Sequence, residues 1–158
     1  MAPLLFLIAG TLGTLAAGRL GVRRLRPWPV PLRAGLALMF TVTGIAHFVG
    51  KRQDLIEMVP PALPAPALLV TVTGVLELAG AAALLSDRTA PWAAGGLSLM
   101  LVGMFPANVH LALNGTDIPW DDRLLPRTAM QVVFLAATLA VVAHYARKPE
   151  KALSRESF

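Results

Sequence analysis

The sequence predicts an all-α, polytopic membrane helix bundle, and three observations support this fold class. Hydrophobic residues make up 56% of the 158 positions and charged residues 15%, whereas soluble domains contain about 45–50% apolar and about 25% charged residues. The apolar residues fall into five runs, each of about 20 residues and therefore long enough to cross a bilayer as a helix. Prolines and charged residues gather between the runs, which leaves no length for a separate soluble domain.

The first run covers residues 3–22, and basic residues follow it instead of preceding it. A cleavable signal peptide carries its positive charge before the apolar stretch, so a retained helix is expected here, with the signal peptide as the alternative. Gly10, Thr14 and Gly18 stand four residues apart, a spacing of small residues that lets another helix approach closely. Residues 23–31 then form a basic linker, whose three prolines disfavour helix.

The other four helices are expected at residues 32–50, 67–85, 91–113 and 125–145. Segments 51–66 and 114–124 connect them on one side of the membrane. The first of these segments is rich in proline from residue 60 onward, and it is expected to be a stiff loop at the membrane surface. The chain therefore divides into an N-terminal helix with its linker (1–31), a four-helix bundle (32–146) and a polar tail (147–158).

The distribution of basic residues predicts the orientation in the membrane. Ten of the 14 Lys and Arg residues, with Arg33 counted among them, fall on the side of the linker, the 86–90 turn and the tail. Because the more basic side stays in the cytoplasm, we expect the N-terminus outside and the C-terminus inside the plasma membrane. Topology then explains the net charge of +5. The expected partner is the lipid bilayer, and no binding of nucleic acid is expected. The chain has no Cys, which excludes disulfide and thiol chemistry.

Several polar side chains interrupt the predicted spans, and such groups usually face a protein interior or a cavity. The ligand-binding candidates are His47, Asn108, Arg127 and Gln131. Glu77 lies about ten residues into its helix, hence roughly 15 Å deep, and is the candidate catalytic residue, as a proton donor. We expect the side chains at positions 47, 77, 108 and 131 to converge on one cavity that opens toward the outer half of the bilayer, beneath the 60–66 loop. The alternative is that each forms a hydrogen bond between packed helices.

A short pattern occurs twice, thirty residues apart. Thr41-Val42-Thr43-Gly44 precedes His47 by the same spacing with which Thr71-Val72-Thr73-Gly74 precedes Glu77. The residue types are common in membrane helices, so chance recurrence is an alternative to a shared role. The pattern draws attention to His47 and Glu77 because each is the ionisable residue of its helix.

Several of these segments together resemble the DoxX and DoxX-like membrane family. The resemblance is carried by residues 44–48 (GIAHF), 58–66 (MVPPALPAP), 74–80 (GVLELAG) and 105–109 (FPANV), and by Arg127 with Gln131. It covers residues 32–145 and implies a four-helix membrane bundle, to which this chain adds an N-terminal transmembrane helix. The family takes its name from a subunit of a thiosulfate:quinone oxidoreductase, and a eukaryotic DoxX-like member acts as a receptor-assembly chaperone.

Two functions therefore follow as expectations. The first is a redox-associated subunit that binds a quinone or similar amphipathic molecule, and that is an enzyme at most as part of a quinone-linked oxidoreductase with a redox partner protein. The second is a non-catalytic chaperone or assembly partner that packs against other membrane proteins through small-residue faces. Haem ligation by His47 and His110, and transport, are weaker alternatives. The sequence shows no nucleotide-binding loop, nucleophile triad or recognisable metal cluster.

Overall fold

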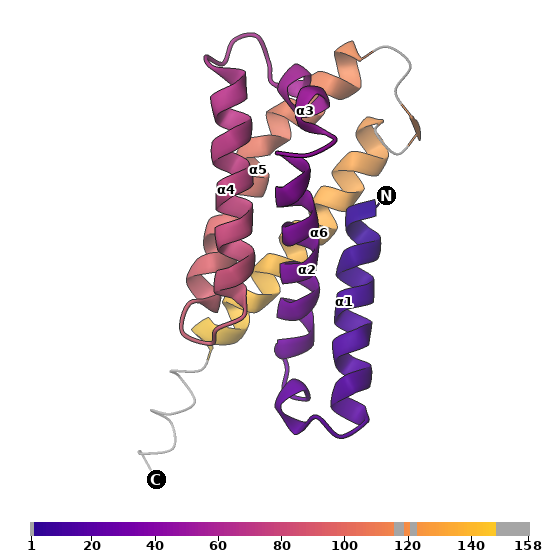
Figure 1. Cartoon of the computed structure of the whole chain (residues 1–158), viewed down its shortest axis with the longest axis vertical. Helices are drawn as coiled ribbons and strands as arrows, with labels where there is room; N and C mark the ends of the chain where they lie inside the picture. Colours follow the sequence, from indigo (N-terminus) through magenta and orange to yellow (C-terminus); the bar gives the residue numbers. More distant parts are fainter. Residues whose placement is uncertain (1, 116–118, 121–122, 148–158) are drawn as a thin grey trace.

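The computed structural model describes residues 2–115, 119–120 and 123–147, and every regular element within them is helical. The expected C-terminal tail, apart from Arg147, and parts of the 114–124 segment lie outside the described residues. Six α-helices and one short 3-10 turn follow in order (Figure 1). They are α1 (Ala2–Arg19), η1 (Arg23–Leu25), α2 (Val30–Ala46), α3 (Arg52–Met58), α4 (Pro66–Leu84), α5 (Ala90–Asn114) and α6 (Leu124–Ala146).

Four helices, α1, α4, α5 and α6, are long and apolar enough to cross a membrane by length and composition. Large apolar side chains point outward from them, including Trp92 at 82% exposure and Leu125 at 84%. Such exposure suits contact with lipid tails, because a soluble protein exposes few contiguous apolar patches. The chain is thus a membrane-embedded helical protein. The expected spans agree with these four helices to within a few residues.

The second expected span, residues 32–50, is corrected by the structure. Helix α2 has 17 residues and ends at Ala46, so His47 caps the helix instead of lying three residues inside it. The following turn contains Gly50 with φ +78°, a left-handed conformation that glycine adopts without steric strain. Helix α2 also begins earlier than expected, at Val30, and Pro31 occupies its first turn. Proline is tolerated there because the first helical N–H groups have no acceptor, so the boundary expected after residue 31 falls within α2.

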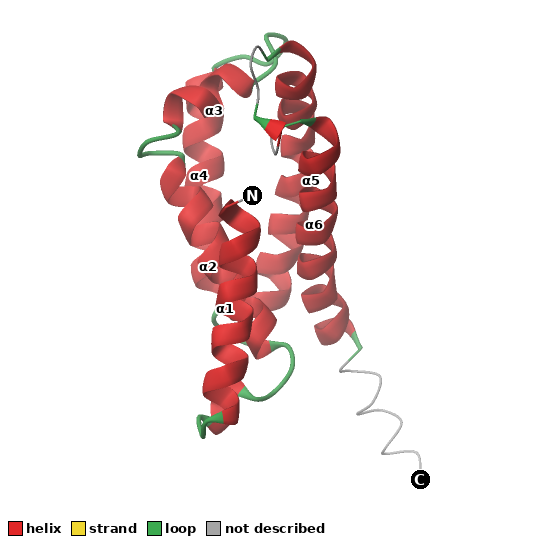
Figure 2. Cartoon of the chain, turned by 90° about the vertical axis from the view of Figure 1, so that its right-hand side faces the viewer, coloured by secondary structure: helices red, strands yellow, loops and turns green. Residues whose placement is uncertain are grey.

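Helix α2 occupies the centre of the bundle. It packs against α1 on one side and α4 on the other, whereas α5 packs against α6 and α4 (Figure 2). Leu36, Phe40, Leu84 and Val141 are buried where these helices meet. Helix α1 lies so close to α2 that a Cβ atom on Gly35 would come within 2.5 Å of the Leu7 carbonyl oxygen. Glycine is therefore needed at this crossing.

A buried arginine fastens the end of the bundle that carries the α4–α5 turn. Arg33 is 4% exposed, and its Nε donates to the Leu84 carbonyl oxygen at 2.6 Å. Its Nη1 donates to the Tyr145 hydroxyl oxygen at 2.7 Å and also pairs with Asp87, to which Tyr145 donates in turn. Arg33 was counted as a loop charge from the sequence. It instead joins α2, the end of α4 and α6, because α2 begins three residues before it.

The two ends of the bundle differ in their charge. Helix η1, the α4–α5 turn and the last residues of α6 lie at one end, and α3 lies at the other (Figure 1). The first end carries Arg19, Arg23, Arg24, Arg26, Arg88 and Arg147. The second carries Lys51, Arg52, Arg123 and Arg127 together with Asp54 and Glu57. Because the more basic end of a membrane protein stays in the cytoplasm, this difference is the basis for predicting that the α3 end faces outward.

Candidate functional site

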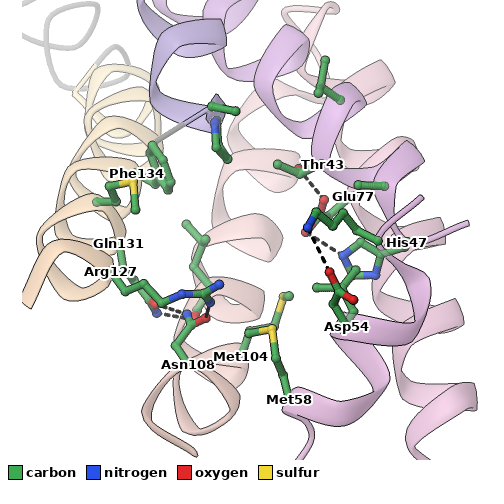
Figure 3. A pocket seen from close by; sticks show the side chains of 18 of the residues that line it. Thr43, His47, Asp54, Met58, Glu77, Met104, Asn108, Arg127, Gln131 and Phe134 are labelled. Carbon is green, nitrogen blue, oxygen red and sulfur yellow. Dashed lines mark hydrogen bonds and ion pairs between the residues drawn. The ribbon is translucent and has the colours of Figure 1, made fainter. Parts of the chain in front are cut away.

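A cavity of about 760 Å³ lies between the α2–α4 pair and the α5–α6 pair, with α3 at one end. Every candidate residue from the sequence lines it, and these residues are His47, Glu77, Asn108, Arg127 and Gln131. Figure 3 shows His47 and Glu77 on one wall and the other three on the opposite wall. The four side chains expected to converge, at positions 47, 77, 108 and 131, thus line one cavity, whereas its position in the membrane and the ligand-binding and catalytic roles stay predictions. Met39, Phe40, Leu101, Met104 and Phe134 supply much of the apolar lining.

On the α2–α4 wall, His47 and Glu77 form a buried pair. Nε2 of His47 lies 3.6 Å from Oε1 of Glu77, and Thr43 donates to Oε2 of Glu77 at 2.5 Å. Nδ1 of His47 lies 2.8 Å from the Val70 carbonyl oxygen. A carbonyl oxygen can only accept, so Nδ1 carries a hydrogen and Nε2 faces the carboxyl group. The 3.6 Å separation of Nε2 and Oε1 is longer than a hydrogen bond, so the two groups form a close, buried polar pair beside the cavity.

The repeated sequence pattern has a reciprocal structural basis. Thr43 precedes His47 by four residues but bonds Glu77, whereas Thr73 precedes Glu77 by four residues and lies 3.2 Å from Nδ1 of His47. The glycine that follows each threonine leaves room for the opposite ionisable residue. A Cβ atom on Gly74 would lie 2.5 Å from Cβ of His47.

A similar relation holds for Gly44, where an added Cβ atom would lie 2.9 Å from Leu78 and 3.2 Å from Cβ of Glu77. Helices α2 and α4 run in opposite directions (Figure 1), so the two copies of the pattern face each other head to tail. Each copy supplies the threonine and the glycine that the other copy's ionisable residue requires.

On the α5–α6 wall, three side chains form a hydrogen-bonded chain with a fixed direction. Arg127 Nη1 donates to Oδ1 of Asn108 at 2.5 Å, and Nδ2 of Asn108 donates to Oε1 of Gln131 at 2.8 Å. Nε2 of Gln131 then donates to the Leu101 carbonyl oxygen at 2.5 Å. Because a guanidinium group can only donate and a carbonyl oxygen can only accept, both amide orientations are determined. Arg127 carries a permanent positive charge, so it is the strongest donor on this wall.

Comparison with known families identifies the region that contains this site. A family model described as a domain of unknown function (DUF8561) matches residues 36–142. The chain belongs to the DUF8561 family. The matched region begins within α2 and ends within α6, so it includes all five candidate residues and excludes α1. No curated protein and no solved structure matches the chain.

The cover of the cavity in this DUF8561 protein comes from α3, which corrects the expectation of a roof at residues 60–66. Asp54, Leu55 and Met58 of α3 line the cavity, whereas the prolines do not. The segment 51–66 was expected to be a loop, but its prolines begin at residue 60 and leave the preceding residues free to form a helix. Arg52 fastens that helix by donating to the His47 carbonyl oxygen at 3.1 Å and to the Thr71 hydroxyl at 3.0 Å.

Sequence reasoning missed Thr43, Met58 and Asp54 as lining residues. Thr43 could have been found because it occupies the position four residues before His47 in the repeated pattern. Met58 and Asp54 had no comparable signal, because the short helix that presents them was not expected.

The structure does not support a haem site between His47 and His110. His47 lines the cavity, but His110 does not, and Nδ1 of His110 lies 3.1 Å from Nδ2 of Asn114 on its own helix. Within the described residues, no group of three or more His, Asp or Glu side chains is placed to hold a metal ion.

Pro106 lies inside α5, which stays helical through it. Because proline has no N–H group, the Val102 carbonyl lacks its usual helical donor. Nε2 of Gln131 donates to the neighbouring carbonyl, that of Leu101.

Proposed function

We propose that this protein is a DoxX-like integral membrane protein that binds a quinone, or a similar amphipathic molecule with two hydrogen-bond acceptors, in the cavity between its two helix pairs. The observation that carries the proposal is the placement of two polar walls across an apolar space. The cavity volume of about 760 Å³ lies within the range of roughly 300–1,000 Å³ that is typical of small-molecule sites.

The two walls offer a quinone complementary chemistry at its two carbonyl oxygens. Arg127 is a permanent donor for one oxygen, and the amides of Asn108 and Gln131 hold it in position. The His47–Glu77 pair holds a proton for the other oxygen, and positioned carboxyl and imidazole groups are the usual proton donors in enzymes. An aromatic or quinonoid ring would lie against the Met and Phe side chains between the walls.

On this proposal the chain binds the ligand and manages its protons, and a partner redox protein supplies the electrons. Its enzymatic role is then that of a subunit of a quinone-linked oxidoreductase. The cavity lies toward the α3 end, away from most of the basic residues (Figure 1). That position supports a site in the outer half of the plasma membrane.

The DoxX-like assignment gains support from how the resembling segments are packed. Gly44, in the first resembling segment, lies close to Glu77 of the 74–80 segment. Gly74 of that segment in turn lies close to His47 of the first. Asn108, Arg127 and Gln131 belong to the remaining ones and form a single hydrogen-bonded chain. The resemblance over residues 32–145 also overlaps the matched DUF8561 region.

The alternative of an assembly partner has less support from the structure. It rested on the small-residue stripe of α1 as a docking face. Gly10 instead contacts Gly35 of α2, and Gly18 contacts the backbone of Leu25 and Arg26. Two of the three residues of the stripe are thus used within the chain.

A tailless benzoquinone tests the proposed site. The purified protein in detergent should melt at a higher temperature when the quinone is saturating, because a ligand of the native state adds about 2.7 kcal/mol at 100 times its Kd. Arg127→Leu should weaken quinone binding by about 1–3 kcal/mol, since a hydrogen bond from a charged group is lost. Arg88→Leu removes the same charge from the α4–α5 turn, where Arg88 is exposed, and should leave binding unchanged.

Two results would contradict the proposal. One is an unchanged melting temperature at every quinone concentration. The other is equal weakening by Arg127→Leu and Arg88→Leu, which would mean that the quinone senses surface charge and not the cavity.

A further inference from the structure

A second hollow adjoins the cavity on the lipid-facing side of α6. It is an apolar groove of about 410 Å³, formed by Leu4 of α1, Trp120, and one face of α6 within residues 125–133. Along α6 this face presents Pro126, Ala129 and Val133, which are spaced three and four residues apart and therefore lie in one row.

The groove and the cavity lie next to each other along both α6 and α1. Met130 lines both of them, because it lies on α6 between the cavity face, with Arg127 and Gln131, and the groove face. On α1, Pro3 lines the cavity and the next residue, Leu4, lines the groove. The two hollows are therefore neighbours, and the residue that they share on α6 is a flexible methionine side chain.

We propose that the ligand has two parts, a polar ring in the cavity and an apolar chain, of the isoprenoid or alkyl kind, in the groove between α1 and α6. This inference rests on the proposed function and specifies the ligand class further. A polar group would lose its hydrogen bonds with water in the groove, because apart from Trp120 and the weakly accepting sulfur of Met130 the groove is lined by side chains without hydrogen-bonding atoms. An apolar chain loses nothing there, and its attachment to the bound ring keeps it next to the groove. Helix α1, which lies outside the DUF8561 region, thus takes part in recognising the chain.

The test compares two probes with the same ring, a dimethoxy-methyl-benzoquinone without a tail and its derivative with a ten-carbon tail. Ala129→Phe fills the groove at an exposed position, so the fold should tolerate it. It should weaken binding of the tailed probe by about tenfold, which corresponds to about 1.4 kcal/mol, and should leave the tailless probe unchanged. Taking the ratio of variant to unaltered protein for each probe cancels the partitioning of the tail into detergent.

Ala136→Phe is the matched control. It makes the same substitution two turns farther along the same face of α6, at another exposed position outside the groove, and both probes should bind it unchanged. A second measurement uses a photoreactive group at the end of the tail, which should crosslink to the peptides that contain Leu4 or Val133.

The possible failures are distinguishable. If both probes bind and Ala129→Phe affects neither, a bilayer lipid occupies the groove and the two-part ligand is wrong, while the proposed cavity function stands. Crosslinks confined to other helices would overturn the inference in the same way. If the tailless probe does not bind at all, the proposed function fails and the inference fails with it.

Discussion

Glu77 has two partners with different requirements, and glutamine can meet both of them. Thr43 donates to one carboxyl oxygen, whereas Nε2 of His47 needs a donor because its hydrogen is on Nδ1. The amide of Gln can accept from Thr43 through its oxygen and donate to His47 through its nitrogen. We therefore expect Glu77→Gln to lower the free energy of unfolding by less than about 1 kcal/mol, measured by thermal unfolding in detergent.

Glu77→Leu should be more harmful, because it removes the polar partner of Nε2 of His47 at a cost of about 1–3 kcal/mol. Thr43 keeps the carbonyl oxygens of Met39 and Phe40 as acceptors. Glu77 lines the cavity and at the same time belongs to a buried polar cluster, in which Thr43 donates to Oε2 and Nε2 of His47 lies 3.6 Å from Oε1. Glu57→Leu changes the same residue type on exposed α3 and serves as the control. If Gln proves as destabilising as Leu, a charged His47–Glu77 pair is required for stability.

Arg33 shows why a residue's role could not be predicted from the distribution of charge. Counting placed it correctly at the more basic end, since it lies at the start of α2. Its burial depends on Leu84, Asp87 and Tyr145, which are more than fifty residues away in the sequence. Only the packing of α2 against α4 and α6 brings these acceptors together, and a single sequence does not specify which helices pack.

At the scale of the helices, a Gly→Ala substitution is expected to lower the stability at one position and to raise it at another. Gly35→Ala would place a Cβ atom 2.5 Å from the Leu7 backbone, so the α1–α2 crossing must widen, and we expect a loss of about 1–3 kcal/mol. Gly13 has nothing within 4 Å of the added atom. Gly13→Ala should therefore stabilise α1 by about 0.5–1 kcal/mol, since alanine favours helix.

Thermal unfolding of the two variants in one detergent measures both effects. Gly74→Ala should resemble Gly35→Ala, because Cβ of His47 has no flexible end that could move aside. Equal stability of Gly35→Ala and Gly13→Ala would show that α1 is not packed closely on α2.

The elements themselves were predictable where hydropathy defines them. Helices α1, α4, α5 and α6 follow from uninterrupted apolar runs, and their ends lie near the expected ones. Helix α3 was not predicted, because a seven-residue helix offers too short a pattern and lies before a proline-rich stretch. The end of α2 was misplaced because residues 47–50 continue the apolar run while the backbone turns at Gly50.

For the whole molecule, the predicted orientation can be tested without interference from native thiols, because the chain has no Cys. Gln53→Cys lies on α3, and Ser86→Cys lies in the α4–α5 turn at the opposite end of the bundle (Figure 1). An impermeant maleimide should label position 53 in intact cells and position 86 only after the cells are opened, since the basic end is expected inside. Labelling of position 86 in sealed cells would reverse the orientation.

The site was predictable as a set of residues but not as a mechanism. Polar side chains in apolar helices identified all five candidates, because a membrane tolerates such groups only where protein or water satisfies them. Their division into two walls depends on which helices are neighbours. The direction of the Arg127 to Leu101 hydrogen-bonded chain likewise depends on a backbone carbonyl that no sequence pattern reveals.

Helix α2 is bonded to its neighbouring helices at both of its ends. Arg33 fixes the start of α2 to α4 and α6, and His47 fixes its far end to α4, about 21 Å away along the helix axis. These bonds join α2 to α4 at both of its ends. Tyr145, near the end of α6, bonds Arg33, whereas Arg127 lies in the first turn of α6, at the other end of that helix. We therefore expect any change in the width of the cavity to come from the α5–α6 wall, because the wall with His47 and Glu77 belongs to helices that are joined at both ends of α2.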